Sequence, residues 1–164
     1  MPRPPRVLHL ATHGFYRPAA TPLDRPLLLS GVALAGANHA LREPGRDGIL
    51  HAIEVQDLDL EGTELVVLSA CKTAQGQIDY GEGVSGLVRA LRTAGARHVM
   101  VTLRPVSDEG AADFVQRFYR HWLGQAESDP PAAFRAAQLE AMNASPGSPA
   151  RRDQTWAHFV LIGG

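Results

Sequence analysis

The sequence predicts an α/β domain in which a mostly parallel sheet is covered by helices on both faces, a three-layer arrangement. Two segments, Leu65–Ala70 and His98–Leu103, are rich in aliphatic and β-branched residues, which is typical of strands buried on both faces. Between them, four aliphatic residues repeat at the spacing of a one-sided helix: Val84, Leu87, Val88 and Leu91. This order of strand, helix and strand predicts two parallel strands joined by a right-handed crossover.

For the N-terminal part of the chain, the sequence predicts less regular structure. Val7–Ala11 is expected to be a short buried strand that ends at Thr12-His13-Gly14, and the proline-rich residues 15–26 are expected to form a loop. The apolar segment 27–35 is interrupted by Ser30-Gly31, so a bent strand or hairpin fits it better than a helix. Residues 38–48 are expected to be a polar loop, with a turn or two of helix in the mixed segment that follows, up to Leu60.

In the C-terminal part of the chain, the predicted helices and strands can be told apart more clearly. A loop with four glycines is expected before the helix at 84–91, and Gly95 is expected to close that helix. Further helices are expected over Asp108–Leu123 and from Pro130 to about Asn143. Residues 145–153 are rich in Gly, Pro and Ser and are expected to be a flexible linker before the last strand, Phe159–Ile162. Residues 1–164 are thus expected to form a single domain.

Composition excludes several classes of function. The 164 residues are 45% hydrophobic, enough for a real core, and 16 Lys+Arg against 17 Asp+Glu leave a net charge of −1, which argues against nucleic-acid binding. Cys71 is the single cysteine, so an intramolecular disulfide and a cysteine-rich zinc site are excluded, and a reducing cytoplasm is expected. No apolar segment approaches a membrane span, and the N-terminus lacks the apolar stretch of a signal peptide. The histidines show no metal-binding spacing, so no metal is expected. No other cofactor is expected either.

Two reactive residues follow predicted strands. His13 comes directly after the first strand and Cys71 directly after the second clear one. The carboxyl ends of neighbouring parallel strands meet at one edge of a sheet, so both side chains face the same crevice if these strands are neighbours. A cysteine nucleophile needs thiolate character, which an adjacent imidazole supplies. Gly14, without a Cβ, would let a substrate carbonyl approach backbone N–H groups that could bind an oxyanion.

At these residues the sequence resembles the CHAT peptidases, a family of the caspase and separase clan. The resemblance covers nearly the whole chain in family order and rests on these stretches: Leu8–Gly14, Glu64–Thr73, Gly81–Val84, Leu87–Leu91, Ala94–Arg97 and Trp156–Gly163. It implies a caspase-like fold and a cysteine endopeptidase that hydrolyses peptide bonds of a protein substrate through a thioester. It further implies that His13 is the general base and Cys71 the nucleophile, with the backbone N–H groups of Gly14 and Cys71 binding the oxyanion.

The sequence departs from the family in two places. The family commonly has Leu-Trp-Pro-Val-Asp-Asp where this chain has Leu-Arg-Pro-Val-Ser-Asp at residues 103–108, which changes the polarity expected of the substrate pocket. The full family domain also has strands and helices ahead of the histidine strand, which here begins at residue 7. The chain is therefore expected to be a fragment or a shortened copy that lacks the N-terminal strands. A helical repeat region, a partner chain or self-association would then cover the uncovered sheet.

Other interpretations of these residues remain open. Asp108 either complements the dipole of its helix or forms a pocket wall that recognises a basic substrate residue, a role for which Glu82 and Asp79 compete. His9 is expected to be a buried, hydrogen-bonded histidine that supports the site, and Cys71 by itself could be a small core residue.

Alternatives for the whole chain also remain. A non-catalytic interaction module would keep these residues without assembling a substrate groove. Residues 81–86 match the G-x-G-x-x-G dinucleotide fingerprint, but ten residues separate Gly81 from Ala70, whereas the fingerprint requires the first glycine directly after the strand.

Overall fold

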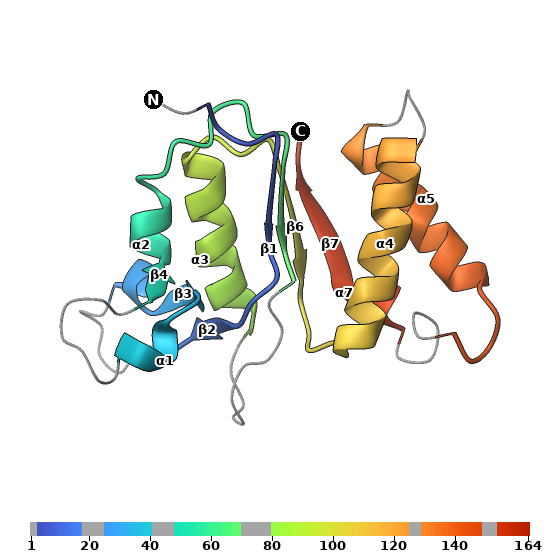
Figure 1. Ribbon diagram of the computed structural model, residues 1–164, viewed down its shortest axis with the longest axis horizontal. Coiled ribbons are helices and arrows are strands. Elements are labelled where there is room, and N and C mark those ends of the chain that lie inside the picture. The colour runs from blue at the N-terminus through green and yellow to red at the C-terminus, as the bar shows by residue number, and fades with distance from the viewer. Residues whose placement is uncertain (1–2, 18–24, 41–47, 70–79, 125–128, 149–153) are drawn as a thin grey trace. The chain divides into compact units, whose positions relative to one another are not determined.

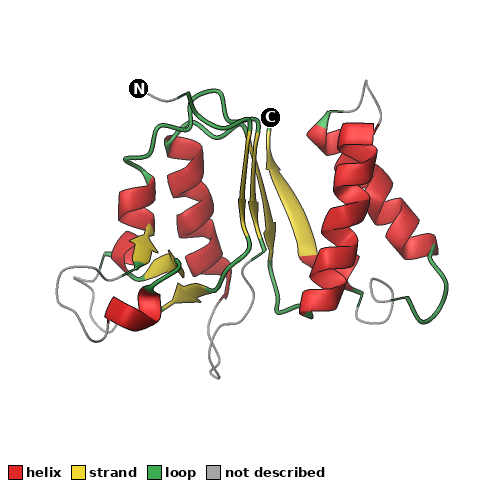
Figure 2. Ribbon diagram, in the orientation of Figure 1, coloured by secondary structure: helices red, strands yellow, loops and turns green. Residues whose placement is uncertain are grey.

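The computed structural model describes residues 3–17, 25–40, 48–69, 80–124, 129–148 and 154–164 (Figure 1). The chain forms two compact units, one made of residues 1–101 with 162–164 and the other of residues 102–161. Helices and strands alternate through most of the chain, as Figure 2 shows, so the expected mixed α/β class is confirmed.

The first unit is built on a mostly parallel sheet with the strand order β1-β5-β6-β7. β1 (Val7–Leu10) is parallel to β5 (Leu65–Leu68), and β5 is parallel to β6 (His98–Thr102). Every residue of β5 and β6 is buried, as their aliphatic sequences predict. These three strands confirm the predicted parallel sheet.

The last strand, β7 (Phe159–Gly163), is next to β6 in this sheet. The backbone N–H of Leu103 donates to the carbonyl of His158, while Gly163 lies against Arg97 and His98 at the opposite end of β6. Residues 162–164 belong to the first unit. β7 therefore reaches the sheet from the direction opposite to the other three strands.

The helix α3 (Tyr80–Thr93) follows β5, with α2 (Ala52–Val55) beside it in Figure 1. Among its described side chains, Leu87, Val88, Ala90 and Leu91 are buried. The helix ends as predicted at Gly95, whose φ of +109° is left-handed, and the N–H groups of Gly95 and Ala96 donate to the carbonyls of Arg92 and Leu91. Its start differs from the prediction, because Gly81, Gly83 and Gly86 lie inside the helix and not in a loop before it. The buried face outweighs a helix-propensity cost of about 1 kcal/mol for each glycine.

A second, antiparallel sheet with the order β2-β3-β4 corrects the prediction for the N-terminal part. It contains β2 (Gly14–Tyr16), β3 (Ser30–Ala33) and β4 (Ile49–His51), and the short helices η1 (Pro26–Leu28) and α1 (Ala37–Ala40) flank β3. Where a bent strand or hairpin was expected within 27–35, the structure has the single strand β3, and its partners β2 and β4 come from outside that segment. Each strand has only three or four residues, too few to show a period of two, and is stabilised by partners distant in sequence.

The second unit consists mainly of two predicted helices, α4 (Asp108–Gly124) and α5 (Pro130–Asn143). The Ser107 hydroxyl accepts a hydrogen bond from the N–H of Gly110 at 3.1 Å, and the Asp129 carboxylate accepts one from the N–H of Ala132 at 2.8 Å. Both contacts satisfy N–H groups that a helix start leaves without intrahelical partners. The caps explain why the helices begin close to the predicted residues.

Packing within this unit is aromatic and close. Phe114 stacks on Phe159 with ring centroids 4.5 Å apart and meets the edge of Phe134 at 5.6 Å. Gly110 permits a close approach of α4 to α7 (Thr155–His158), since a Cβ at this position would overlap the Thr155 hydroxyl. The sequence did not predict α7. Of the expected linker, residues 145–148 form a turn, in which the N–H of Ser148 donates to the carbonyl of Ser145, and residues 149–153 lie outside the described part.

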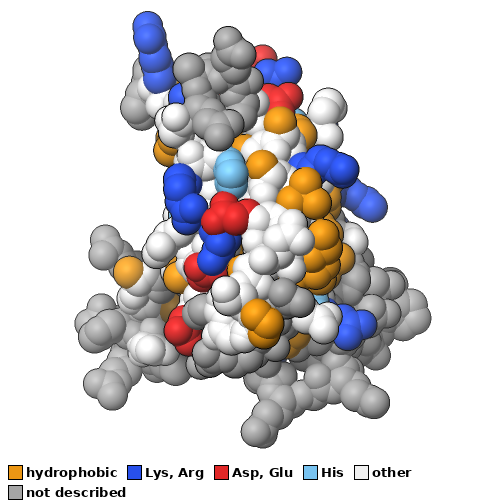
Figure 3. Space-filling view, turned by 90° about the vertical axis from the view of Figure 1, so that its right-hand side faces the viewer, with side chains coloured by type: hydrophobic (Ala, Val, Ile, Leu, Met, Phe, Trp, Pro, Cys, Tyr) orange, Lys and Arg blue, Asp and Glu red, His pale blue; other side chains and the backbone are white. Residues whose placement is uncertain are grey.

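Ion pairs join α4 to α5 on the outer face of this unit. Glu140 of α5 contacts Arg117, Arg120 and His121 of α4, and Arg117 also pairs with Asp113. Figure 3 shows acidic and basic side chains gathered about a histidine on this face, with hydrophobic side chains alongside. Within the described part of the chain, the helices are too short or too polar to span a membrane.

Candidate functional site

The parallel pairing of β1 with β5 fixes where the predicted site begins. Leu10 lies opposite Leu68, the last residue of β5, and the N–H of Ser69 donates to the carbonyl of Leu10 at 3.2 Å. His13 comes three residues after Leu10, and Cys71 comes three residues after Leu68. The two strands are therefore neighbours, as the prediction required, and they end together. Cys71 itself lies outside the described residues, so its distance from His13 stays a prediction.

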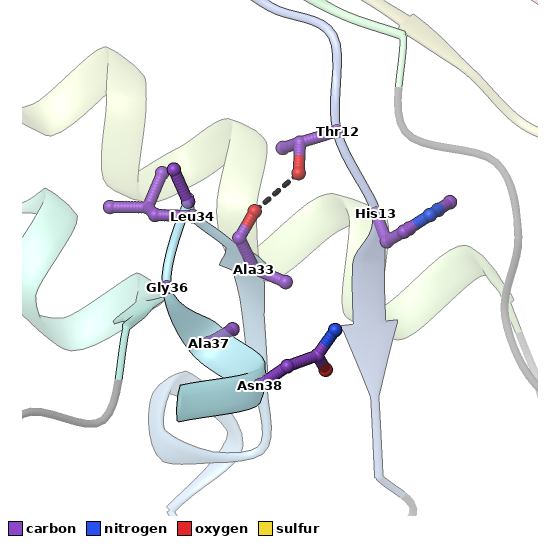
Figure 4. Close-up of a pocket in the computed structure, with 8 residues that line it drawn as sticks. Thr12, His13, Ala33, Leu34, Gly36, Ala37 and Asn38 are labelled. Atoms are coloured by element: carbon purple, nitrogen blue, oxygen red, sulfur yellow. Dashed lines mark hydrogen bonds between the residues drawn. The ribbon is translucent and has the colours of Figure 1, made fainter. Parts of the chain in front are cut away.

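The backbone that carries His13 is held against β3. The Thr12 hydroxyl donates to the carbonyl of Ala33, and the N–H of Ala33 donates to the carbonyl of His13 at 2.8 Å. His13 is exposed, and Figure 4 shows its imidazole extending away from Asn38. One residue of β3 thus anchors both Thr12 and His13 while the imidazole stays accessible.

A pocket of about 400 Å³ opens beside His13. Thr12 and His13 line one side, and residues 33–38 line the other. These residues leave β3 through a tight turn in which the N–H of Ala37 donates to the carbonyl of Leu34 at 3.1 Å, and Gly36 takes a φ of +98°. Glycine adopts this conformation without strain, so the Ala35-Gly36 sequence suits the turn that forms the pocket wall.

Comparison with known proteins shows which protein family the chain belongs to. A family model of the CHAT domain matches residues 1–164. The chain belongs to the CHAT domain family. This confirms the resemblance carried by Thr12-His13-Gly14 and by the segment around Cys71, and the CHAT domain is related to the caspase-like peptidases. The mostly parallel sheet agrees with that relationship.

One curated relative of this CHAT domain is the human protein Tetratricopeptide repeat protein 28, which is 34% identical over 121 residues. The match covers 73% of this chain but only 5% of the relative. The chain therefore corresponds to a small part of that much longer protein.

Gly14, the predicted oxyanion donor of the CHAT domain, is the first residue of β2 and lies opposite Val32 of β3. This pairing holds the residue after His13 in an extended strand. The oxyanion role of its N–H, and that of Cys71, stay predictions.

His9 differs from its expected burial. The residue is exposed, and it lies on β1, the first strand in the order of its sheet. Its Nε2 atom lies 3.4 Å from the Ser69 hydroxyl, and partial burial of the ring lowers the pKa of His9 below its ordinary value. His9 thus contacts the residue that follows β5, two positions before Cys71.

The three acidic residues predicted for a substrate pocket fall in different parts of the chain, Glu82 in the first unit and Asp108 in the second. Asp108 is exposed in the first turn of α4, where its charge complements the helix dipole. Glu82 lies in the first turn of α3, and Asp79 falls outside the described residues. Which of these residues recognises a basic substrate residue stays a prediction. The first glycine of the dinucleotide pattern, Gly81, also lies in the first turn of α3 and not directly after β5.

Nothing in the sequence indicated that Thr12 and residues 33–38 form the walls of a pocket beside His13. An apolar segment that ends at Gly36 signals a turn, but nothing in it indicates which other segment the turn faces. Pairing of β2 with β3 brings the wall to His13. Among the described residues, the acidic, cysteine and histidine side chains form no cluster of three or more suited to a metal ion.

Proposed function

We propose that this CHAT domain is a cysteine endopeptidase in which His13 is the general base and Cys71 the nucleophile. The observation that carries the proposal is the pairing of Leu10 with Leu68, because it makes the strands that precede His13 and Cys71 parallel neighbours ending at the same level. Membership in the CHAT family and the accessible imidazole of His13 support the assignment.

The reaction proposed has two halves. His13 takes the proton of the Cys71 thiol, and the thiolate attacks the carbonyl carbon of a peptide bond to form a tetrahedral intermediate. The backbone N–H groups of Gly14 and Cys71 stabilise the negative oxygen. The intermediate collapses to a thioester as His13 returns the proton to the leaving amine. Water activated by His13 then hydrolyses the thioester, which releases the acid and restores the thiol.

The test of this proposal is thiol labelling of the folded protein across pH. Cys71 is the single cysteine, so labelling reports on it alone, and Cys71→Ala gives the blank. We expect alkylation of the wild type to persist well below about pH 8.5, the pKa of a free thiol, and His13→Ala to remove this reactivity. His158→Ala is the matched control, because His158 lies in α7, ahead of β7, and does not follow one of the parallel strands. Ordinary thiol pH dependence that is indifferent to His13 would reject the assignment.

A non-catalytic interaction module is the second candidate function. It is favoured by the relative Tetratricopeptide repeat protein 28, whose name describes repeats and no enzymatic activity. In this alternative, a repeat-containing region, a partner chain or a second copy of this chain would bind the domain. The same labelling distinguishes the candidates, because a scaffold has no need of an activated thiol. For either candidate we propose a cytoplasmic location, which suits a single cysteine kept reduced.

A further inference from the structure

We propose that the pocket beside His13 is a substrate subsite that accepts an uncharged side chain. This inference rests on the proposed peptidase function and deepens it by naming the class of residue bound. Residues next to a scissile bond must lie close to the general base, and His13 lines this pocket while its imidazole extends away from the Asn38 wall (Figure 4).

The chemistry of the pocket walls carries the proposal. Ala33, Leu34, Ala35 and Ala37 supply apolar surface, and apart from His13 none of the described lining residues is ionisable. The Thr12 hydroxyl is already engaged by the carbonyl of Ala33. This leaves the Asn38 amide as the polar side chain on the α1 side, where Figure 4 shows it directed toward the segment that carries His13.

These walls discriminate against charge. A Lys, Arg, Asp or Glu side chain entering the pocket would lose water without meeting an opposite charge among the described lining residues, and that loss is unfavourable. An aliphatic side chain would bury apolar surface against Leu34 and the alanines. A small hydroxyl or amide side chain could form a hydrogen bond with the Asn38 amide. The pocket therefore favours uncharged residues.

The pocket is formed before substrate arrives. The turn at Ala35-Gly36 is closed by the hydrogen bond between Ala37 and Leu34, and Ala33 is bonded to both Thr12 and His13. Its volume of about 400 Å³ is within the range of small-molecule sites, and it is open to solvent on one side, as a subsite for one side chain of a longer peptide must be.

The test introduces a negative or a positive charge at Ala35. This residue is exposed and lines the pocket, so that substitution there is compatible with folding. A synthetic peptide library is cleaved by the wild type, by Ala35→Asp and by Ala35→Lys, and the products are sequenced by mass spectrometry. Binding of the same peptides to Cys71→Ala, alone and combined with each Ala35 variant, is measured in parallel. Ala132→Asp is the matched control, because Ala132 is an exposed alanine of α5.

We expect the wild type to disfavour charged residues at one position near the scissile bond. At that position Ala35→Asp should raise the preference for Lys over Glu by about fivefold, Ala35→Lys should lower it by about the same factor, and Ala132→Asp should leave it unchanged. Unaltered selectivity in both Ala35 variants, with cleavage and binding intact, would overturn the subsite while leaving the peptidase standing. Failure of the wild type to cleave, and of Cys71→Ala to bind, any library peptide would overturn both.

Discussion

Ala33 of β3 is hydrogen-bonded to the side chain of Thr12 through its carbonyl and to the backbone of His13 through its N–H. The Thr12 hydroxyl is therefore a positioning group for the proposed general base, although it does not touch the reacting atoms. Because β1 ends at Leu10, residues 11–13 form the short connection to β2, and these two hydrogen bonds fix its path.

We predict that Thr12→Val, which removes the hydroxyl and keeps the shape of the side chain, slows alkylation of Cys71 near neutral pH by about tenfold, because small displacements of a base reduce its efficiency strongly. At about pH 9 the thiol ionises without help, so the rate should change little there. Thr12→Ser should restore the neutral-pH rate. Equal slowing at both pH values would indicate general unfolding of the segment and contradict the positioning role.

The lowered pKa of His9 predicts a pH-dependent stability. A histidine whose folded-state pKa is depressed stabilises the fold fully above its unfolded value of about 6.5, and this contribution is lost as the pH falls through the folded-state pKa. Between about pH 8 and pH 5, the free energy of unfolding should fall less in His9→Gln than in wild type, as measured by urea titration. His158→Gln is the control. Identical pH profiles for wild type and His9→Gln would refute the prediction.

Glu140 is expected to hold α4 and α5 together. Its carboxylate lies 2.6 Å from Arg117, 3.0 Å from Arg120 and 2.7 Å from His121. Burial acts to raise the pKa of Glu140, but the hydrogen bonds from His121 and Arg120 and the charges of Arg120 and Arg117 outweigh it, so that the pKa is lowered. The stabilisation is therefore present above the ordinary carboxyl pKa and lost as the pH falls below it.

We predict that Glu140→Gln lowers the free energy of unfolding by about 1–2 kcal/mol at neutral pH, between the values of exposed and buried ion pairs. Glu61→Gln is the control, because Glu61 is an exposed residue outside the helices and strands. In acid, where Glu140 is protonated, the free energies of unfolding of Glu140→Gln and Glu61→Gln should differ from that of wild type by the same amount. A difference between them that persists there would contradict the electrostatic cause.

The aromatic stack between α4 and β7 predicts a large packing effect. Phe114 and Phe159 are 0% and 1% exposed, so truncation of either leaves a cavity. We expect Phe114→Ala to reduce the free energy of unfolding by about 3–5 kcal/mol. Leu123→Ala, at a residue that is 60% exposed on the same helix, should change it by less than about 0.5 kcal/mol. Comparable losses in both variants, followed by circular dichroism, would show that the stack is not the cause.

The elements that the sequence predicted well share one property, which is that their signal is local. The buried strands β5 and β6 each contain a continuous aliphatic segment, and α4 repeats its apolar residues over four turns. In contrast, β2 and β4 have three residues each, and their strand character arises from pairing with β3. The start of α3 was misplaced for the related reason that its glycines oppose helix formation locally while the buried face beyond them favours it.

The sequence by itself determined the α/β class, the parallel strands β5 and β6 joined through α3, and membership in the CHAT family, because each depends on residue types and spacings along the chain. Only the tertiary structure decided that Ala33 anchors Thr12 and His13, that residues 33–38 form a wall of the adjoining pocket, and that His9 is exposed. Each of these is a relationship between segments brought together by strand pairing or by position in the sheet. Linear periodicity carries no information about such partners, since it reports which face of an element is apolar and not what that face meets.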